Sequence, residues 1–230
     1  MLGRVRWVIQ ILALGAFAVG LAPAADRELA ADDFGHGLDQ WVVEQQPGGS
    51  VTLSDGRLII ADSNGCTVWF RQRLRAPVII TYEVTMSSAK RVSDLNCFWM
   101  ASDPARPGDL FAAGHARDGR FTTYDGLRTY YVGYGGNANS TTRFRRYDGT
   151  GARPLQPQHD LGAREFLLIP DHVYHVKLVV TAEGHVQYLR DGEVVFDFQD
   201  PAPLTSGWFG FRTVQSRMEI GHFRVVRPDN

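Results

Sequence analysis

Arginine and tyrosine side chains gather in one short stretch, residues 129–148, which also contains a glycine- and asparagine-rich turn. Because side chains alternate between the two faces of a strand, Arg143 and Arg145 are predicted to share one face of a hairpin. Guanidinium groups this close repel each other unless an anion or a hydrogen-bond acceptor lies among them, and phenol rings offer flat surfaces to sugars. The stretch therefore predicts a polar ligand groove. The alternative is a solvated edge hairpin that uses arginine to prevent edge-to-edge pairing.

The tyrosines of this hairpin are predicted to lie on both faces of its first strand. Tyr131 and Tyr134 are three positions apart, so a regular strand directs them to opposite sides. One of the two is then structural, unless Gly133 marks a β-bulge. The turn at residues 135–139 contains the Gly and Asn residues that supply the positive φ values of a hairpin loop.

Two further polar residues are candidates for a site. Asn96 alternates with apolar residues in a predicted strand at 95–100, and it is either a buried amide with protein partners or an amide that faces a ligand. His159 stands beside Asp160 in a segment expected to fold over one end of the groove, and histidine titrates near neutral pH. Adjacent residues do not face each other on a strand, so a catalytic role for His159 competes with a structural one.

Short alternating segments separated by turn residues run through most of the chain and predict an all-β sandwich. We expect the opening strand at 32–34, its return at 40–43, and a hairpin turned by Asp55 and Gly56. The last sixty residues read as an antiparallel meander. Residues 102–127 show no strand pattern, and long connections of this kind in compact domains are usually functional.

Composition restricts the partners and the compartment. The 230 residues carry a formal net charge of −1, which excludes a protein-wide attraction to nucleic acid or to an anionic membrane. Residues 1–24 combine two arginines, an apolar run and a small-residue end, and are predicted to be a secretory signal peptide cleaved near Ala24. A retained anchor is the alternative. The mature chain, residues 25–230, is then expected to be secreted or periplasmic, free of the membrane, and a single domain.

The two cysteines, Cys66 and Cys97, each lie in an apolar, strand-like run. Export to an oxidising compartment permits a disulfide, and two separate buried thiols fit the pattern equally well. The histidines are spread over separate segments without metal-ligand spacing, so no metal site or cofactor is expected.

The order of strands, turns and glycines over residues 174–226 resembles the concanavalin A-like superfamily of lectins and glucanases. The resemblance implies a jelly-roll β-sandwich of two antiparallel sheets, with the ligand across the concave sheet and often a structural calcium ion. Asp32 or Asp33 is the candidate ligand for calcium, although two adjacent acids do not make a site. More narrowly, residues 65–74, 91–104 and 129–149 are similar to the YesU-like family of bacterial proteins associated with polysaccharide degradation.

The resemblance also implies a saccharide cleft. Its expected border is Asn96, Tyr131, Tyr134, Arg143 and Arg145. Trp69 and Arg71 share a strand face and extend the cleft, and Trp99 is a further candidate for stacking on a sugar. A tryptophan in a sandwich is alternatively part of the core.

The function expected from these residues is action on a polysaccharide or oligosaccharide, most concretely as a uronate-directed polysaccharide lyase. Elimination requires a cation to neutralise the uronate carboxylate, a base to remove the adjacent proton, and an acid for the leaving oxygen. Arg143 or Arg145 is assigned to the first role, and Tyr131 or His159 to the other two. The motifs of the jelly-roll alginate lyases are not found in matching form, and no Glu-x-Asp-x-x-Glu strand supports a retaining glycosidase.

Two alternatives remain. A non-catalytic glycan-binding module needs aromatic and arginine contacts but no acid–base pair. A sandwich that only mediates protein contacts would leave the arginines exposed.

Overall fold

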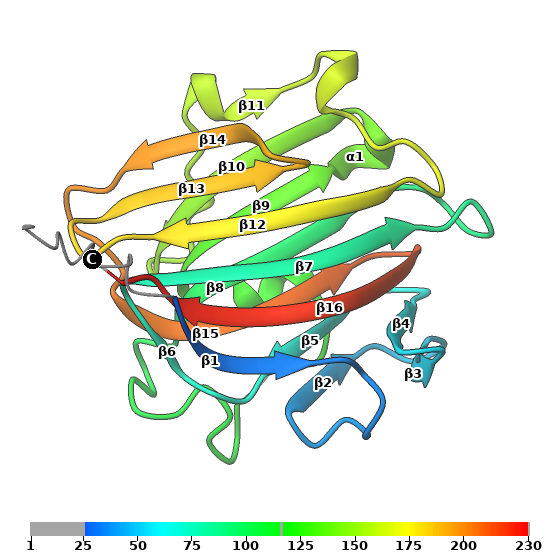
Figure 1. Cartoon of the computed structure of the whole chain (residues 1–230), viewed down its shortest axis with the longest axis horizontal. Helices are drawn as coiled ribbons and strands as arrows, with labels where there is room; N and C mark the ends of the chain where they lie inside the picture. The colour runs from blue at the N-terminus through cyan, green and yellow to red at the C-terminus, as the bar shows by residue number, and fades with distance from the viewer. Residues whose placement is uncertain (1–25, 116, 230) are drawn as a thin grey trace, which may run out of the picture.

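Two antiparallel sheets packed face to face form the molecule, as a computed structural model shows for residues 26–115 and 117–229 (Figure 1). The first sheet has the order β14-β13-β12-β7-β16-β4-β3, and β1 pairs with β16. The second has the order β11-β10-β9-β8-β15-β5-β2, and β6 pairs with β15. The predicted all-β jelly-roll sandwich is confirmed. The predicted signal peptide lies outside the described residues.

The strands are short and joined mostly by tight turns. Those of the first sheet are β1 (Arg27–Asp32), β3 (Ser50–Ser54), β4 (Arg57–Ala61), β7 (Val78–Met86), β12 (Val173–Val180), β13 (His185–Arg190), β14 (Glu193–Gln199) and β16 (Arg217–Arg227). Those of the second are β2 (Trp41–Gln45), β5 (Cys66–Phe70), β6 (Leu74–Arg75), β8 (Leu95–Ser102), β9 (Arg128–Gly135), β10 (Thr141–Asp148), β11 (Asp160–Leu161) and β15 (Ser206–Thr213). Short helical turns are η1 (Phe121–Tyr124), α1 (Gly136–Asn139), η2 (Pro157–His159) and η3 (Arg164–Phe166). Among the described residues, no helix is both long and apolar enough to cross a membrane.

The main core lies between the two sheets and follows from the alternation of the sequence. Along β7, buried side chains alternate strictly with half-buried ones, as expected for a strand with one face in a core. Cys66 and Cys97 are both buried in this core and are not bonded to each other. Burial raises the pKa of the Cys97 thiol to about 12, so it stays protonated and packs as a small apolar group.

The start of the sandwich differs from the expectation. β1 ends at Asp32, and Phe34 leaves the strand with a φ of 58°. The Asp32 carboxylate accepts hydrogen bonds from the Phe34 amide at 2.7 Å and from Trp41 Nε1 at 2.8 Å, which stabilises a turn where a strand was expected. The segment before it has weak strand propensity and is extended because it pairs with β16. The predicted Asp-Gly hairpin is confirmed, and so is the meander over β12, β13 and β14. The meander was wrong for the last two strands, because β15 and β16 lie in opposite sheets and pair with β8 and β7.

A second, smaller apolar cluster covers part of the outer face of the second sheet. Its members come from the sheet and from the connection between β8 and β9: Trp69, Phe98, Ala101, Leu110, Tyr124, Leu127, Tyr131, Tyr147 and Trp208. A buried ion pair holds the connection down, because Arg117 Nε donates to Glu44 Oε1 at 3.2 Å. The other Glu44 oxygen accepts from Trp69 Nε1 at 2.8 Å. The long connection therefore lies on the sheet instead of extending into solvent.

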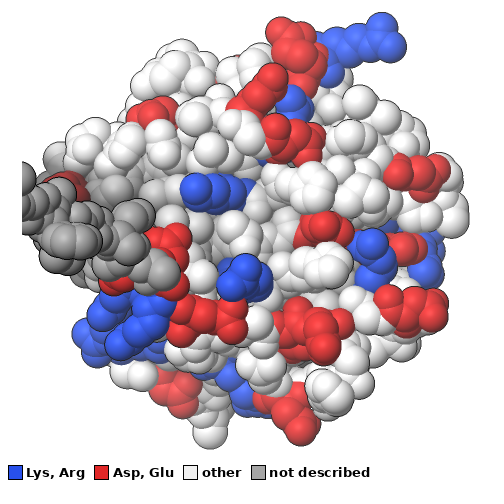
Figure 2. All heavy atoms as spheres, in the orientation of Figure 1, with Lys and Arg blue, Asp and Glu red and all other residues white. Residues whose placement is uncertain are grey.

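On the outer face of the first sheet, acidic and basic side chains are interspersed (Figure 2). No broad area of one sign is visible on this face, in keeping with the near-zero net charge. The arginines of the central hairpin belong instead to the second sheet, on β10.

Candidate functional site

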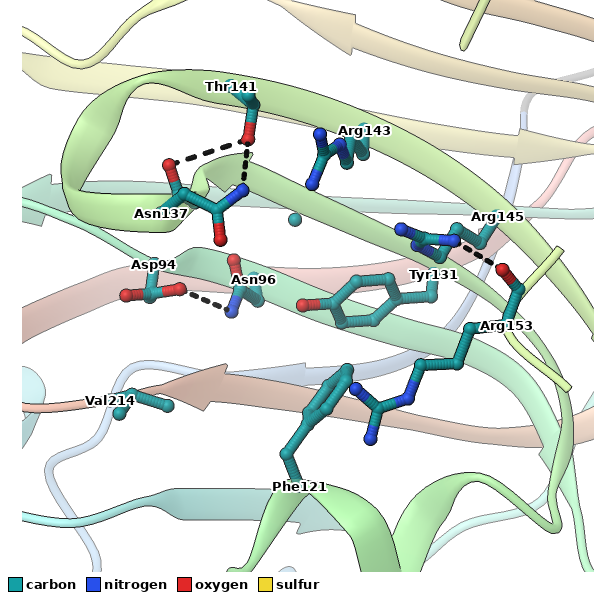
Figure 3. A pocket seen from close by; sticks show the side chains of 12 residues that line it. Asp94, Asn96, Phe121, Tyr131, Asn137, Thr141, Arg143, Arg145, Arg153 and Val214 are labelled. Atoms are coloured by element: carbon teal, nitrogen blue, oxygen red, sulfur yellow. Dashed lines mark hydrogen bonds between the residues drawn. The ribbon is translucent and has the colours of Figure 1, made fainter. Parts of the chain in front are cut away.

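A pocket of about 250 Å³ opens on the outer face of the second sheet, over β8, β9 and β10 (Figure 3). Its lining is Asp94, Asn96, Phe121, Tyr131, Gly133, Gly136, Asn137, Thr141, Arg143, Arg145, Arg153 and Val214. Ligand pockets range over ~300–1,000 Å³, so this one is small and suits a ligand of one or two rings. Most of the polar groups that reach it come from three adjacent strands and the turn at α1.

The register of the strands arranges the residues on the floor of the pocket in two rows. Asn96, Gly133 and Arg143 lie directly opposite one another across β8, β9 and β10. One step along the strands on the same face, Tyr131 lies opposite Arg145. Because these side chains are held by hydrogen-bonded strands, their spacing is set by the sheet and not by a loop. The prediction that the two arginines share a face is confirmed.

Gly133 creates the space in which the Tyr131 phenol lies. A Cβ at position 133 would be 3.0 Å from the phenol oxygen and 3.1 Å from a ring carbon. The ring also packs against Phe98, with centroids 4.9 Å apart, and Phe121, at 5.6 Å. Burial raises the pKa of Tyr131 well above that of an ordinary phenol. At neutral pH its hydroxyl is therefore a neutral donor and acceptor, not a base.

Replacing Gly133 by alanine should test this contact. The methyl group would press on the Tyr131 ring, so we expect the free energy of unfolding to fall by about 1 kcal/mol. Gly108→Ala is the matched control, since a Cβ there meets nothing within 4 Å. Urea denaturation of the two variants measures the difference, and equal stabilities would show that the ring moves aside without cost.

The amide groups of Asn96 and Asn137 present their oxygens to the pocket. Asn96 is 2% exposed, and its Nδ2 lies 3.5 Å from Asp94 Oδ1. A carboxylate only accepts, which orients the amide and leaves Asn96 Oδ1 buried without a partner among the described residues. Asn137 Nδ2 donates to Thr141 Oγ1 at 3.3 Å, and its oxygen points towards Asn96 (Figure 3). This end of the pocket therefore favours a ligand that donates hydrogen bonds.

Arg143 is neutralised by a carboxylate. Its Nε and terminal nitrogen donate to the two Asp160 oxygens at 2.7 and 3.2 Å, a bidentate pair at the outer edge of β10. These hydrogen bonds lower the pKa of Asp160 below its usual value. The free energy that this pairing contributes is present above the unfolded-state pKa of ~3.9 and is lost as the pH falls through the lower folded-state pKa.

Asp160→Asn should therefore destabilise the protein by less than about 1 kcal/mol at neutral pH, because the pair is partly solvated. We expect the difference from the wild type to shrink as the pH falls below ~3.9 and to disappear below the lower folded-state pKa, where the carboxylate is protonated in both states. Thermal unfolding across an acidic pH series measures this, with Asp26→Asn as an exposed control. A difference that persists unchanged at the acid end would contradict the ionic origin.

Arg145 has no carboxylate partner among the described residues. Its guanidinium donates to the backbone oxygens of Arg153 and Pro154, at 2.5 and 3.2 Å. Arg153 in turn is paired with Asp125, through contacts of 2.8 and 2.7 Å. Of the three arginines that line the pocket, Arg145 is thus the one whose charge is left for a ligand.

Two of the expected cleft residues lie in the main core instead. Tyr134 is on the face of β9 opposite Tyr131, and its hydroxyl accepts from Arg190 at 2.7 Å. Trp99 is 0% exposed and packs against Tyr130 between the sheets. The prediction that they border the cleft was wrong because alternation along a regular strand turns both inward.

Trp69 and Arg71 also lie outside the pocket. Trp69 is on the outer face but fully buried, stacked on Phe98 at 5.4 Å and hydrogen-bonded to Glu44. Arg71 follows the end of β5 and donates to the Asp39 backbone oxygen at 2.9 Å. Neither side chain extends the cleft, because the β8–β9 connection covers the sheet between them and the pocket.

His159 lies in a separate hollow. The ring is buried and packs edge-on against Phe144 at 4.9 Å, Phe198 at 5.7 Å and Phe196 at 5.9 Å. Burial lowers its pKa, so the ring is neutral at pH 7. It does not line the pocket that holds Tyr131, and this separates the acid–base roles that were assigned to the two residues.

Several lining residues were not singled out from the sequence. Asp94 lies two positions before Asn96, so alternation along a strand places both side chains on one face. This pattern could have identified Asp94 from the sequence. Phe121 and Arg153 come from irregular connections, where no periodicity indicates the direction of a side chain. Within residues 26–115 and 117–229, no group of three or more acidic, His or Cys side chains is arranged to hold a metal ion. That finding includes Asp32 and Asp33, and the Asp32 oxygens are already occupied by the hydrogen bonds of the first turn.

Solved structures with this fold include carbohydrate-binding proteins. A protein of unknown function with a galectin-like fold from Bacillus subtilis superposes with a TM-score of 0.68 at 19% identity, covering 90% of this chain and 99% of the other. The carbohydrate-binding module CBM66 from Bacillus subtilis gives 0.56 at 10% identity, covering 81% and 95%. The exoplasmic/lumenal domain of VIP36, in its Ca²⁺/Man₃GlcNAc-bound form, gives 0.55 at 12% identity, covering 85% and 87%. At these identities the likeness establishes the jelly-roll sandwich fold alone.

Comparison with curated proteins found no match. A family model, by contrast, matches residues 60–223, from β4 into β16, and so includes the whole of the central hairpin and the pocket. This chain belongs to the family described as domain of unknown function DUF6250.

Proposed function

We propose that this protein binds an acidic glycan in the pocket over β8, β9 and β10. The observation that carries the proposal is the polarity of the pocket. Within the part of the chain that the structure describes, Arg145 supplies a guanidinium without a carboxylate partner, while Asn96 supplies a buried amide oxygen without a donor. A uronate unit has both complements, a carboxylate for the first and hydroxyl groups for the second.

The shape of the site supports the same ligand class. The Tyr131 ring is 6% exposed and lies in the floor beside the half-buried Phe121 ring. Together the two rings give the pocket an apolar patch for the face of a pyranose. The superposed structures include a carbohydrate-binding module and a glycan-bound lumenal domain, so the fold is one on which sugar sites are built. The narrower resemblance to the YesU-like family adds polysaccharide degradation as the proposed context.

A uronate-directed lyase is the second candidate, favoured by the position of Arg145 beside Tyr131. Arg145 is placed to neutralise a carboxylate, and the protonated Tyr131 is suited to donate to a leaving oxygen. No residue is assigned to the third role, that of the base that removes the proton next to the carboxylate. His159 lies in another hollow, and the Asp94 carboxylate already accepts from Arg91 and Ser93. Binding without cleavage is therefore the function that we put forward.

Calorimetric titration of the mature protein with galacturonate and glucuronate oligomers tests binding directly. We expect affinity for at least one acidic oligomer and much weaker affinity for its neutral counterpart, and the absorbance of unsaturated uronate should not rise during incubation. Affinity for neutral and acidic oligomers alike would remove the role of Arg145. An increase in that absorbance would replace the binding module with the lyase.

We further propose that the chain is exported and meets its glycan in the periplasm or outside the cell. The residues that support this are the arginines, the apolar run and the small residues of positions 1–24. Expression in a bacterial host should yield a product that begins close to position 25, as determined by amino-terminal sequencing. Recovery of the unprocessed chain from the membrane fraction would favour an anchor.

A further inference from the structure

We propose that the pocket receives the terminal unit of a glycan chain and excludes internal segments. This inference rests on the proposed function and adds a restriction on the substrate. The reason is that loops close the outer face of the second sheet on two sides of the pocket. A chain that enters the pocket from the side of α1 and Arg143 therefore meets closed surface ahead of it.

The first closure lies across the strands, beyond Asn96. Arg212 is the neighbour of Asn96 on β15 and is only 1% exposed. Its guanidinium lies 4.9 Å from the ring centroid of Phe121 and 5.0 Å from that of Tyr124. It also donates to the Gly119 backbone oxygen at 2.9 Å. The connection between β8 and β9 thus lies directly on the row of polar residues that would otherwise continue the pocket.

Backbone contact makes this closure tight. A Cβ added at Gly119 would be 2.4 Å from the Gly65 oxygen and 2.9 Å from the Glu44 oxygen. Both glycines have positive φ, and no side chain separates the connection from the edge of the sheet. A sugar ring has no room between the connection and the edge of the sheet. The sheet beyond β15 is therefore not available to a ligand.

The second closure lies along the strands, beyond Tyr131. Arg153, from the segment after β10, forms a bidentate ion pair with Asp125, from the turn after η1. The Arg153 guanidinium also stacks on Phe121, 4.6 Å from the ring centroid. This bridge joins the connection that precedes β9 to the one that follows β10, at the end of the hairpin where Arg128 pairs with Asp148. Figure 3 shows Phe121 and Arg153 together at this end of the pocket.

Arg145 lies at this closed end. Its guanidinium donates to the backbone oxygens next to the bridge, while Asn137 and Thr141 lie at the other end of the pocket, beside α1. A carboxylate that reaches Arg145 must therefore belong to a unit with no further unit beyond it. The rest of the chain leaves past α1 and Arg143. The geometry assigns recognition to a chain terminus.

The number of chain ends per unit mass provides the test. Polygalacturonate is compared with the same mass of polygalacturonate after partial acid hydrolysis, and both compete against a labelled galacturonate oligomer. We expect the half-inhibitory mass concentration to fall in proportion to the increase in chain ends. Linear oligomers from the dimer upwards should differ in molar affinity by less than about threefold.

Potency that depends on mass alone, or molar affinity that rises steadily with oligomer length, would overturn terminal recognition and leave glycan binding intact. Absence of binding by monomer, oligomer and polymer would overturn both proposals. Because galacturonate is one acidic glycan among several, the same comparison is run with glucuronan. Terminal recognition is then judged from the polymer that binds more tightly.

Opening the bridge tests the cause of the restriction. Arg153→Ala removes both the ion pair and the stacking on Phe121, and the polymer should then compete better per chain end than it does with the wild type. Asp125→Asn keeps the shape of the bridge and weakens its charge, so it should preserve the dependence on chain ends. Unchanged behaviour of a folded Arg153→Ala variant would show that the bridge does not limit the ligand.

Discussion

Replacing Arg145 by alanine should weaken binding of an acidic oligomer by about 30-fold, which corresponds to about 2 kcal/mol. The guanidinium has no carboxylate partner among the described residues, so a bound anion would be its counterion. A charge-assisted bidentate hydrogen bond in a partly desolvated pocket contributes this amount, whereas a solvated arginine contributes little. Calorimetry with the oligomer that binds best measures the change.

The controls separate charge from geometry and from folding. Arg145→Lys keeps the charge but loses the planar fork, so it should recover part of the affinity. Arg120→Ala removes an exposed arginine that pairs with Asp118 at the surface, and this variant should bind as the wild type does. Arg145→Ala with unchanged affinity and an unchanged unfolding transition would remove the anion-binding role from this residue.

Replacing Glu44 by alanine should lower the free energy of unfolding by about 3–5 kcal/mol. Its carboxylate is buried and accepts from Trp69 Nε1 at 2.8 Å and from Arg117 Nε at 3.2 Å, and it lies 3.1 Å from His115 Nε2. Without it, the buried Arg117 charge would have its nearest remaining carboxylate in Asp103, at 3.5 Å. The connection between β8 and β9 would be released from the sheet.

Chemical denaturation followed by tryptophan fluorescence measures this effect, because Trp69 lies under the released connection. Glu44→Gln keeps an acceptor for Trp69 and should cost less than the alanine variant. Glu193→Ala removes a largely exposed carboxylate that lies 3.4 Å from Arg190, and it should cost less than about 1 kcal/mol. If the Glu44 and Glu193 variants lost equal stability, the connection would not depend on the buried carboxylate.

The faces of the central strands were predictable from the sequence because alternation is a local property. Arg143 and Arg145 share a face with Tyr131, and Tyr134 lies on the other, as strand geometry requires. The choice of Tyr134 and Trp99 as cleft residues gave sugar chemistry more weight than this alternation. Alternation along the strands, which placed the two arginines correctly, also predicts that Tyr134 and Trp99 point into the core.

The β8–β9 connection was not predictable in the same way. Its residues show no periodicity, so the sequence indicates a long loop but not where the loop lies. Its position depends on contacts between residues far apart in the chain, such as Arg117 with Glu44 and Arg212 with Gly119. These contacts bury Trp69 and confine the polar row over β8, β9 and β10 to a small pocket.

The sequence by itself determined the all-β class, the strand pairing of the hairpins and the common face of the two arginines, because each depends on alternation and turn residues within a few positions. Only the tertiary structure decided which arginine keeps a free charge. Asp160 approaches Arg143 through pairing of β11 with β10, whereas the backbone next to Arg145 offers carbonyl groups and no carboxylate. The free guanidinium and the closed pocket around it arise from packing between distant segments, which no local pattern encodes.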